Sequence, residues 1–504
     1  MSSHRDIRTL GGLRKTSYRP VPVKEEIRRN LMSMKRDGRP PFEGIVGYAH
    51  TVLPKIENAL LSRHDFLLLG LRGQAKTRIL RQLVRLLDEW TPAIAGCQIN
   101  DDPLSPLCKR CRRLQDEQGD DLPLVWLHRD ERYQEKLATP DVTIADLIGD
   151  IDPIKAARDR LTFADEEVIH FGIVPRTHRG IFALNELPDL QPRIQVGLLN
   201  IMEERDFQIR GFPVRLLIDV LMVFSANPED YTNRGNIITP LKDRIASQIL
   251  THYPRSLEEA MRITDQEAWT ERGIEYHIPK WFREILEQVA FEARGSEFVD
   301  QNSGVSARIG ISAYESLLSN LERRALETGD GPVYPRIADL QAVVPAISGK
   351  IELVYEGEQQ GPDAVARHIV GQAVKTVFQK HFPRVTKEVR RRRRADAQVE
   401  RPAPERSAAY DRVTAWFSGG ERVAVSDLMP QSEYVAQLHR VDSLEEIARE
   451  FMPAAEEREL PGVMELVLEG LYQNSFVAKE TVEYSTFYSD MLMRMFDGLG
   501  EESD

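Results

Sequence analysis

The chain has 504 residues, of which 41% are hydrophobic and 29% are charged, and its formal net charge is −12. This length predicts roughly three domains. The acidic balance argues against a nucleic-acid-binding protein with a basic surface, and no apolar run approaches the ~18 residues of a membrane span. Three cysteines are too few for a disulfide framework, and no secretory signal is expected, so we expect a protein of the reducing cytoplasm.

Five segments of the chain differ in composition. Residues 1–41 carry many Arg and Lys residues without a clear hydrophobic period, which predicts a mobile basic arm, or one that orders only against a neighbour. Residues 42–250 alternate short apolar runs with helical stretches, and residues 251–385 are mostly helical. Residues 386–406 are rich in Arg and Pro and indicate a linker. Residues 407–504 are predicted to form an acidic helical region.

Four apolar runs in the second segment have the length of buried strands. Buried runs separated by helices are typical of a parallel sheet that is covered on both faces. The predicted class is therefore α/β. The runs are Phe66–Leu69, Leu124–Leu127, Ile181–Leu184 and Leu221–Phe224.

A glycine-bearing turn follows the first of these runs and precedes a helical pattern. Its spacing is that of a phosphate-binding loop, except that Ala75 stands where the second glycine is usual. Lys76 would bring positive charge to the outer phosphates and Thr77 a hydroxyl ligand for Mg²⁺. We expect Ala75 to keep negative backbone dihedrals, because only then is its methyl group tolerated. The alternative is an ordinary strand, turn and helix with a surface lysine. The candidate residues are Gly70, Gly73, Gln74, Ala75, Lys76 and Thr77.

The three cysteines lie close together in the sequence. Cys108 and Cys111 form a C-x₂-C pair, which is half of a tetrahedral zinc site, and Cys97 would be a third ligand. The fourth ligand would be His128, a carboxylate or water. A loop with free thiols and a redox-sensing loop are the alternatives.

Polar residues end the third and fourth apolar runs. Glu186 is the candidate for polarising an attacking water, and Asn185 would hold the water shell of Mg²⁺ without adding negative charge. Asn227 would hold the water or the γ-phosphate from the opposite side. The alternatives are a solvated Glu at a strand end and a turn-forming Asn before Pro228.

Together these motifs resemble those of the AAA+ ATPases, and more closely the group of magnesium chelatase subunit I and the MoxR ATPases, which is the helix-2-insert clade. The segment Gly70–Thr77 is similar to the G-x-x-G-x-A-K-T loop of that group. His178–Glu186 resembles its Walker B strand, in which Asn185 departs from the usual Asp. Ser225–Pro228 resembles its sensor 1.

Three further segments extend the resemblance over residues 42–325. Phe42–Gly47 resembles the opening segment, where Ile45 and Val46 would flank the adenine. Leu241–Arg244 is similar to the L-x-D-R box, and Ser306–Arg308 to the start of the sensor 2 helix in the lid.

The resemblance implies an AAA+ α/β domain, a helical lid and a helical C-terminal extension. Arg244 would be the arginine finger that acts on the neighbouring subunit, and Arg308 the lid arginine of its own subunit. Residues 141–175 would hold the helix-2 insertion, and Phe207 to Pro213 the pre-sensor hairpin. The implied cofactors are ATP and Mg²⁺, and the implied partners are further copies in a hexameric ring and a protein with a von Willebrand factor A domain.

The sequence leaves three functions open. The first is a ring motor that hydrolyses ATP and remodels or activates a partner protein. The second is a nucleotide-switch scaffold with slow turnover, because Asn185 replaces the Walker B Asp. The third is a nucleic-acid motor or a transcription activator, and against it stand the acidic composition and the absence of a G-A-F-T-G-A loop.

Overall fold

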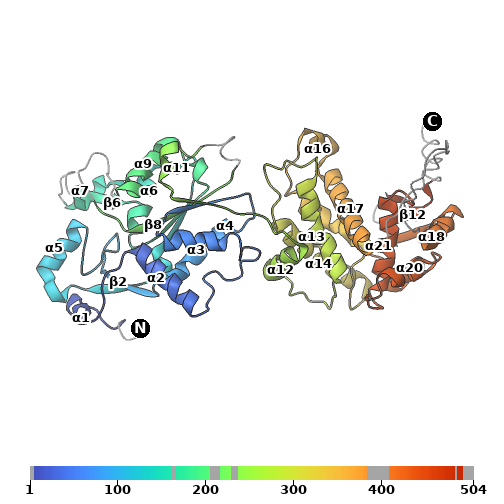
Figure 1. Cartoon of the computed structure of the whole chain (residues 1–504), viewed down its shortest axis with the longest axis horizontal. Helices are drawn as coiled ribbons and strands as arrows, with labels where there is room; N and C mark the ends of the chain where they lie inside the picture. The colour runs from blue at the N-terminus through green and yellow to red at the C-terminus, as the bar shows by residue number, and fades with distance from the viewer. Residues whose placement is uncertain are drawn as a thin grey trace, which may run out of the picture. The chain divides into compact units, whose positions relative to one another are not determined.

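The computed structural model describes residues 5–159, 166–204, 216–228, 236–382, 408–482 and 485–491. The chain divides into two compact units, residues 1–253 and 254–504 (Figure 1). The predicted pre-sensor hairpin, from Phe207 and Ile209 to Pro213, and the predicted linker over 386–406 lie outside the described residues.

The central sheet of the first unit is formed by five parallel strands. Their order across the sheet is β4-β7-β8-β1-β9, so the first strand of the chain lies between two strands that follow it much later. The carboxyl ends of β1, β7 and β8 therefore lie side by side at one edge. The predicted α/β class is confirmed. The strands are β1 (Phe66–Leu69), β4 (Tyr133–Leu137), β7 (Gly180–Asn185), β8 (Val220–Ala226) and β9 (Ser247–Leu250).

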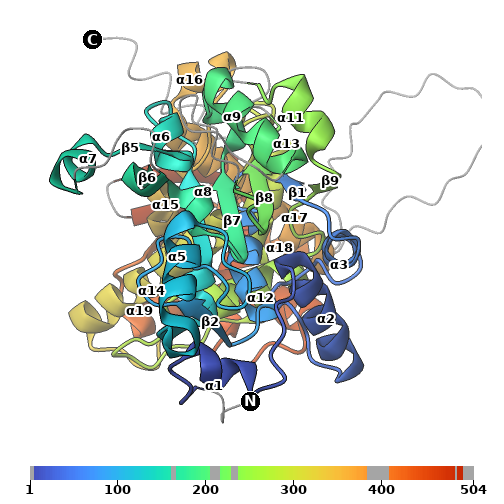
Figure 2. The ribbon, with the colours of Figure 1, turned by 90° about the vertical axis from the view of Figure 1, so that its left-hand side faces the viewer.

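Helices cover both faces of this sheet, which can be followed in Figure 2. Successive side chains of a strand point to opposite faces, and in β1 Phe66 and Leu68 pack into one apolar core while Leu67 packs into another. The first core also takes in α2, α3 and α4, and the second takes in α6, α8, α9 and α11. Two buried faces explain why the strands have continuous apolar sequences. The helices include α3 (Leu53–Leu61), α4 (Lys76–Gln82), α6 (Ile144–Leu147), α8 (Ile173–Arg176), α9 (Pro192–Glu203) and α11 (Thr239–Arg244).

The N-terminal segment is packed on this domain, and the predicted mobile arm is therefore wrong for residues 5–41. The helix α2 (Val23–Arg36) follows the short helix α1 (Leu10–Arg14). In α2, Val23, Ile27 and Leu31 are each at most 1% exposed in the core under the sheet. These positions lie four residues apart, which is one helix face, but charged residues fill the positions between them and hide the pattern.

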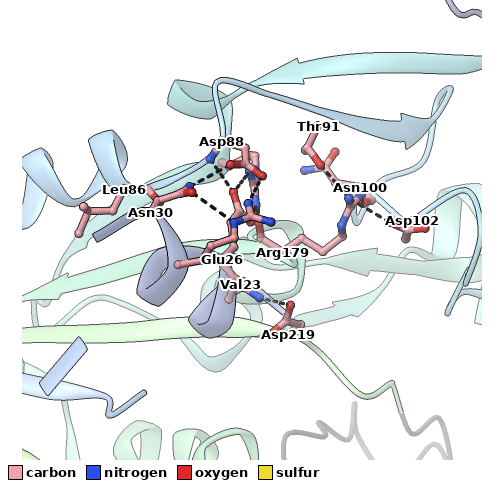
Figure 3. A network of polar contacts seen from close by, with 12 residues as sticks. Val23, Glu26, Asn30, Leu86, Asp88, Thr91, Asn100, Asp102, Arg179 and Asp219 are labelled. Atoms are coloured by element: carbon pink, nitrogen blue, oxygen red, sulfur yellow. Dashed lines mark hydrogen bonds and ion pairs between the residues drawn. The ribbon is translucent and has the colours of Figure 1, made fainter. Parts of the chain in front are cut away.

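Buried ion pairs and hydrogen bonds also fix this segment (Figure 3). Glu26 of α2 pairs with Arg132 at 2.6 Å, and both side chains are almost fully buried. Arg132 also donates to the carbonyl oxygen of Arg179, which directly precedes β7. The side chain of Arg179 in turn pairs with Asp102 at 3.0 Å and donates to the hydroxyl oxygen of Tyr18 at 2.8 Å. Glu26, a charged residue of the predicted arm, thus joins α2 through Arg132 to the segment that leads into β7, the strand that carries Asn185.

The predicted strand Leu124–Leu127 exists but does not belong to the parallel sheet. It is β3 (Leu124–His128), and it pairs antiparallel with β2 (Trp90–Ile94) in a two-stranded ribbon. The helix α5 (Lys109–Gln118) lies between these two strands in the chain. The expected helix-2 insertion holds α7 (Pro153–Asp159) and a second antiparallel pair, β5 (Gly149–Ile151) and β6 (Ile169–Phe171).

The second unit is mostly helical over residues 254–382. Its apolar core continues into residues 410–488, where the helix α21 (Leu460–Gln473) is buried along most of its length. The C-terminal region is not wholly helical, since three strands form an antiparallel sheet of order β10-β12-β11. None of the helices that the structure describes is long and apolar enough to cross a membrane. The strands are β10 (Val423–Ser426), β11 (Ala478–Val482) and β12 (Ser485–Ser489), and the helices are α12 (Leu257–Glu267), α13 (Lys280–Gly295), α14 (Arg308–Thr328), α15 (Val344–Ser348), α16 (Tyr355–Gln360), α17 (Pro362–His381), α18 (Ala408–Ser418), α19 (Gln431–His439), α20 (Leu444–Phe451) and α21.

Candidate nucleotide site

The predicted phosphate loop joins the end of β1 to the start of α4. Gly73 has φ +74°, and Ala75 lies in the left-handed region with φ +57° and ψ +16°. The expectation that Ala75 keeps negative dihedrals is therefore wrong, and its methyl group costs roughly 1–2 kcal/mol in this conformation. A Cβ at Gly70 would overlap the side chains of Thr251 and Gln74, so a larger residue there would displace the hydrogen bond between them. A loop with this backbone points its N–H groups inward and is suited to bind an anion.

Lys76 connects the loop to the end of the neighbouring strand β8. Its side chain is 7% exposed, and its ammonium group donates to the carbonyl oxygens of Gly70 and Leu71. It also donates to Oδ1 of Asn227 at 2.7 Å. The alternative of a surface lysine is thereby excluded. The positive charge lies where the loop and β8 meet.

Glu186 and Asn185 complete the row of polar groups at this edge of the sheet. Nδ2 of Asn227 donates to a carboxylate oxygen of Glu186 at 3.1 Å, so Lys76, Asn227 and Glu186 form a chain of contacts across three strand ends. Glu186 has φ +54°, a strained conformation of the kind that clusters at functional sites. The amide oxygen of Asn185 accepts from the hydroxyl of Ser225 at 2.9 Å. Ser225 was not predicted, although it belongs to the same motif as Asn227.

A second group of residues holds the other side of the loop. The hydroxyl of Tyr48 lies 3.0 Å from the carbonyl oxygen of Gln74 and 2.6 Å from that of His252, and burial raises the pKa of Tyr48 to about 12. The Gln74 side chain accepts from the hydroxyl of Thr251 at 2.6 Å. Tyr48, Thr251 and His252 were missed because no motif or spacing in the sequence connects them with the loop. The predicted adenine-flanking residues Ile45 and Val46 are half-buried just before Tyr48, and Thr77 is half-buried in the first turn of α4.

The two predicted arginines belong to different units. Arg244 is at the end of α11 on the surface of the first unit, where it pairs with Glu203 of α9 and donates to the carbonyl oxygen of Pro240. Arg308 is exposed at the first position of α14, in the second unit. The described contacts of Arg244 do not join it to Lys76 or Glu186.

The three cysteines come together near β2, with Asp101 beside them. One ligand atom from each of these four residues lies within 4.8 Å of all the others. Hydrogen bonds from the thiols of Cys108 and Cys111 hold the pKa of Cys97 well below its usual range. His128, the histidine considered as a ligand, instead contacts Asp130 at 3.0 Å.

Comparison with known proteins gives remote similarities only. No protein-family model and no curated protein matches the chain. Among solved structures, it is similar to a BchI–BchD magnesium chelatase complex, with 17% identity over 62% of this chain and 97% of that chain and a TM-score of 0.32. A putative ATPase from Cytophaga hutchinsonii has 14% identity over 69% of this chain and 95% of its own, with a TM-score of 0.28. NtrX from Brucella abortus has 15% identity and a TM-score of 0.30, and the match spans 53% of this chain and about half, 48%, of the NtrX chain.

The class of the fold follows from the strand order and the loop alone, and it does not depend on the similarities to solved structures. A parallel sheet with β1 between β8 and β9, and a phosphate-type loop between β1 and α4, form an α/β fold of the P-loop kind. Within that fold, three predicted residues from distant parts of the chain, Lys76, Glu186 and Asn227, are in contact.

Proposed function

We propose that the protein binds and hydrolyses ATP, and that it works as a ring motor of the magnesium chelatase I and MoxR type. The observation that carries this proposal is the contact chain from Lys76 through Asn227 to Glu186. A cation for the phosphates, an amide and a carboxylate are the groups that phosphoryl transfer to water requires at one point. In this proposal residues 42–250 form the nucleotide-binding domain and residues 251–385 its lid.

Each of these side chains has a separate task. Lys76 binds the outer phosphate oxygens, together with the N–H groups of the loop. Glu186 orients the attacking water through its carboxylate, and Asn227 fixes the carboxylate through the bond from its Nδ2. The strained backbone of Glu186 is of the kind that clusters at active sites, which supports this role.

The residues present suit Mg²⁺ that is bound mainly through water and phosphate oxygens. Thr77 and Asn185 would hold the ion with a hydroxyl and an amide oxygen, and Mg²⁺ would neutralise charge on the phosphates. Asn185 is 9% exposed and its oxygen already accepts from Ser225, so it contributes a dipole without a charge. This argues for weaker metal binding and slower turnover than an Asp would give.

The surface position of Arg244 suits a residue that acts on the next subunit. A guanidinium on an exposed helix end can reach another protomer, and its pairing with the half-exposed Glu203 is of a kind that contributes only ~0–1 kcal/mol. Hydrolysis would then need an assembled ring, as the resemblance implies, with six subunits. Arg308, exposed at the start of α14, is proposed as the lid arginine of the same site.

The partner is proposed from the resemblance of the motifs. In the chelatase and MoxR group the ring works on a protein with a von Willebrand factor A domain, and we propose such a partner here. Co-purification of the full chain with a candidate of that class, in ATP and in ADP, tests it. Binding that does not differ between the two nucleotides would contradict a motor.

Phosphate release by the pure protein tests the activity, with Glu186→Gln as the matched variant. We expect clear turnover in the wild type and loss of most of it in Glu186→Gln. Equal, negligible rates in both would favour the second candidate function, a nucleotide-switch scaffold, which the uncharged Asn185 specifically supports.

Mixing variants tests the arginine finger. Arg244→Ala should bind ATP normally but hydrolyse it slowly, and Arg193→Ala, an exposed arginine on α9, is the control for lost surface charge. An Arg244→Ala subunit keeps its own Glu186, so Glu186→Gln neighbours can supply the missing arginine. If mixing never restores activity, Arg244 does not act between subunits.

A further inference from the structure

We propose that Cys97, Asp101, Cys108 and Cys111 bind a structural Zn²⁺ ion. The site is separate from the nucleotide-binding residues, and it stands whether or not the protein hydrolyses ATP. Three thiolates and one carboxylate are a soft, four-ligand set that favours Zn²⁺ over Mg²⁺ or Ca²⁺.

Local structure brings the four ligands together from two short elements. Cys97 and Asp101 lie in the loop that follows β2, Cys108 is the N-cap residue of α5, and Cys111 lies in the first turn of that helix. Their ligand atoms are all within 4.8 Å of one another. In a tetrahedral site with Zn–S bonds of ~2.3 Å, neighbouring ligand atoms are about 3.8 Å apart. Only a small contraction of the cluster is therefore needed.

Asp101 gives independent evidence for a cation. It is 0% exposed, and its Oδ1 has no hydrogen-bond partner among the described residues. Its Oδ2, in contrast, accepts from the backbone N–H of Cys108 at 3.0 Å. An unsatisfied buried carboxylate oxygen is costly, and a metal ion at the cluster would satisfy it. Asp101 is thus the fourth ligand that the sequence left open between His128, a carboxylate and water.

The surroundings of the sulfur atoms suit thiolates. The backbone N–H of Asp101 donates to Sγ of Cys97 at 3.4 Å, and that of Cys111 donates to Sγ of Cys108 at 3.3 Å. Such outer hydrogen bonds orient metal ligands. The guanidinium of Arg110, which donates to the carbonyl oxygen of Gly96 at 2.7 Å, supplies positive charge next to Cys97. Four anionic ligands around Zn²⁺ leave a net charge of about −2, and the single positive charge of Arg110 offsets about half of it.

The ion would connect α5 to the loop after β2. A chain of contacts and backbone would link it to the candidate nucleotide site. Asp102, the neighbour of Asp101, pairs with Arg179 at 3.0 Å. Arg179 precedes β7, and β7 ends at Asn185. A structural zinc site contributes folding free energy to the segment that it closes, so this one would hold the loop over 97–111 and the Arg179 anchor in place.

Metal analysis of the full chain, purified with a reductant and without chelators, tests the proposal. We expect about one zinc per chain, and three thiols that react with an alkylating reagent only after a chelator is added. Cobalt exchanged for zinc should show thiolate charge-transfer absorption and the intense visible bands of a tetrahedral site. Less than about one tenth of an equivalent of zinc, even after addition of Zn²⁺ and desalting, overturns the proposal. A Cys108–Cys111 disulfide in the purified chain overturns it as well.

A matched pair of variants separates ligation from general effects of charge. Asp101→Asn should lower zinc affinity in a chelator competition by more than the ~10- to 100-fold that loss of an outer partner costs. Asp116→Asn removes an exposed acid on α5, the helix that carries Cys111, and should leave the zinc affinity unchanged. An unchanged affinity in Asp101→Asn contradicts the role of this residue. If Asp101→Asn fails to fold, the zinc content and cobalt spectrum of the wild type still decide the proposal.

Discussion

The ammonium group of Lys76 lies 2.7 Å from Oδ1 of Asn227, although 151 residues separate the two in the chain. This hydrogen bond joins the predicted phosphate loop to the end of β8. Asn227 in turn donates a hydrogen bond to the carboxylate of Glu186. Binding of phosphate at the loop would compete for Lys76 and thereby change the hydrogen bonding of Asn227. The groups that we propose to bind phosphate and to orient water are in this way coupled through one amide.

Lys76→Ala should weaken ATP binding by about 10- to 100-fold, because a charged hydrogen bond is worth roughly 1.5–3 kcal/mol. Titration with a fluorescent ATP analogue measures the effect. Lys55→Ala, which removes an exposed lysine on α3, should bind as the wild type does. Wild-type affinity in Lys76→Ala would show that the loop does not hold the phosphates.

Asn185→Asp should raise the rate of ATP hydrolysis and lower the Mg²⁺ concentration that gives half of the maximal rate. A carboxylate oxygen can accept from Ser225 as the amide oxygen does, so the fold should tolerate the change. Phosphate release measured against Mg²⁺ concentration checks the prediction, with Asn200→Asp on the exposed side of α9 as the control. A slower enzyme would mean that the amide is required where it stands.

Ala75→Gly should stabilise the protein by about 1 kcal/mol, because glycine adopts φ +57° without strain. The midpoint of denaturant unfolding, followed by circular dichroism, measures this. Ala49→Gly is the control, because Ala49 has no positive φ and gains nothing from the change. A lower midpoint for Ala75→Gly than for Ala49→Gly would contradict the left-handed conformation.

Glu26→Ala should destabilise the first unit by about 3–5 kcal/mol, since it leaves Arg132 buried without its partner. Glu25→Ala removes a neighbouring carboxylate whose ion pairs are 38% exposed or more, and should cost at most ~1 kcal/mol. Thermal unfolding of both variants gives the comparison. Equal, small effects would restore the interpretation of residues 1–41 as a loosely attached arm.

The sequence predicted what depends on local pattern. The apolar runs at Phe66–Leu69, Ile181–Leu184 and Leu221–Phe224 became neighbouring parallel strands, because a strand buried on both faces must be apolar throughout. The run at Leu124–Leu127 has the same composition but pairs antiparallel with β2. Which strand pairs with which depends on tertiary contacts, and the composition of a strand does not determine its partner.

The remaining differences also arise from contacts between distant residues. Glu26 is buried because Arg132, 106 residues later, neutralises it, and a single charged residue in a helix gives no sign of this. The left-handed Ala75 follows from the path that the loop takes between β1 and α4. The proposed ligand role of Asp101 needed the observation that one of its oxygens has no partner among the described residues.

The last residues of the first unit are bonded to the phosphate loop in three places. Thr251 donates to the side chain of Gln74. The carbonyl oxygen of His252 accepts from the hydroxyl of Tyr48, which also contacts the carbonyl oxygen of Gln74. The hydroxyl of Tyr253 donates to the carbonyl oxygen of Arg72 at 2.9 Å. The backbone then passes directly into the second unit at residue 254. A rearrangement of the loop must therefore either move residues 251–253 with it or break these hydrogen bonds. Movement of the loop is in this way coupled to the segment at which the first unit ends.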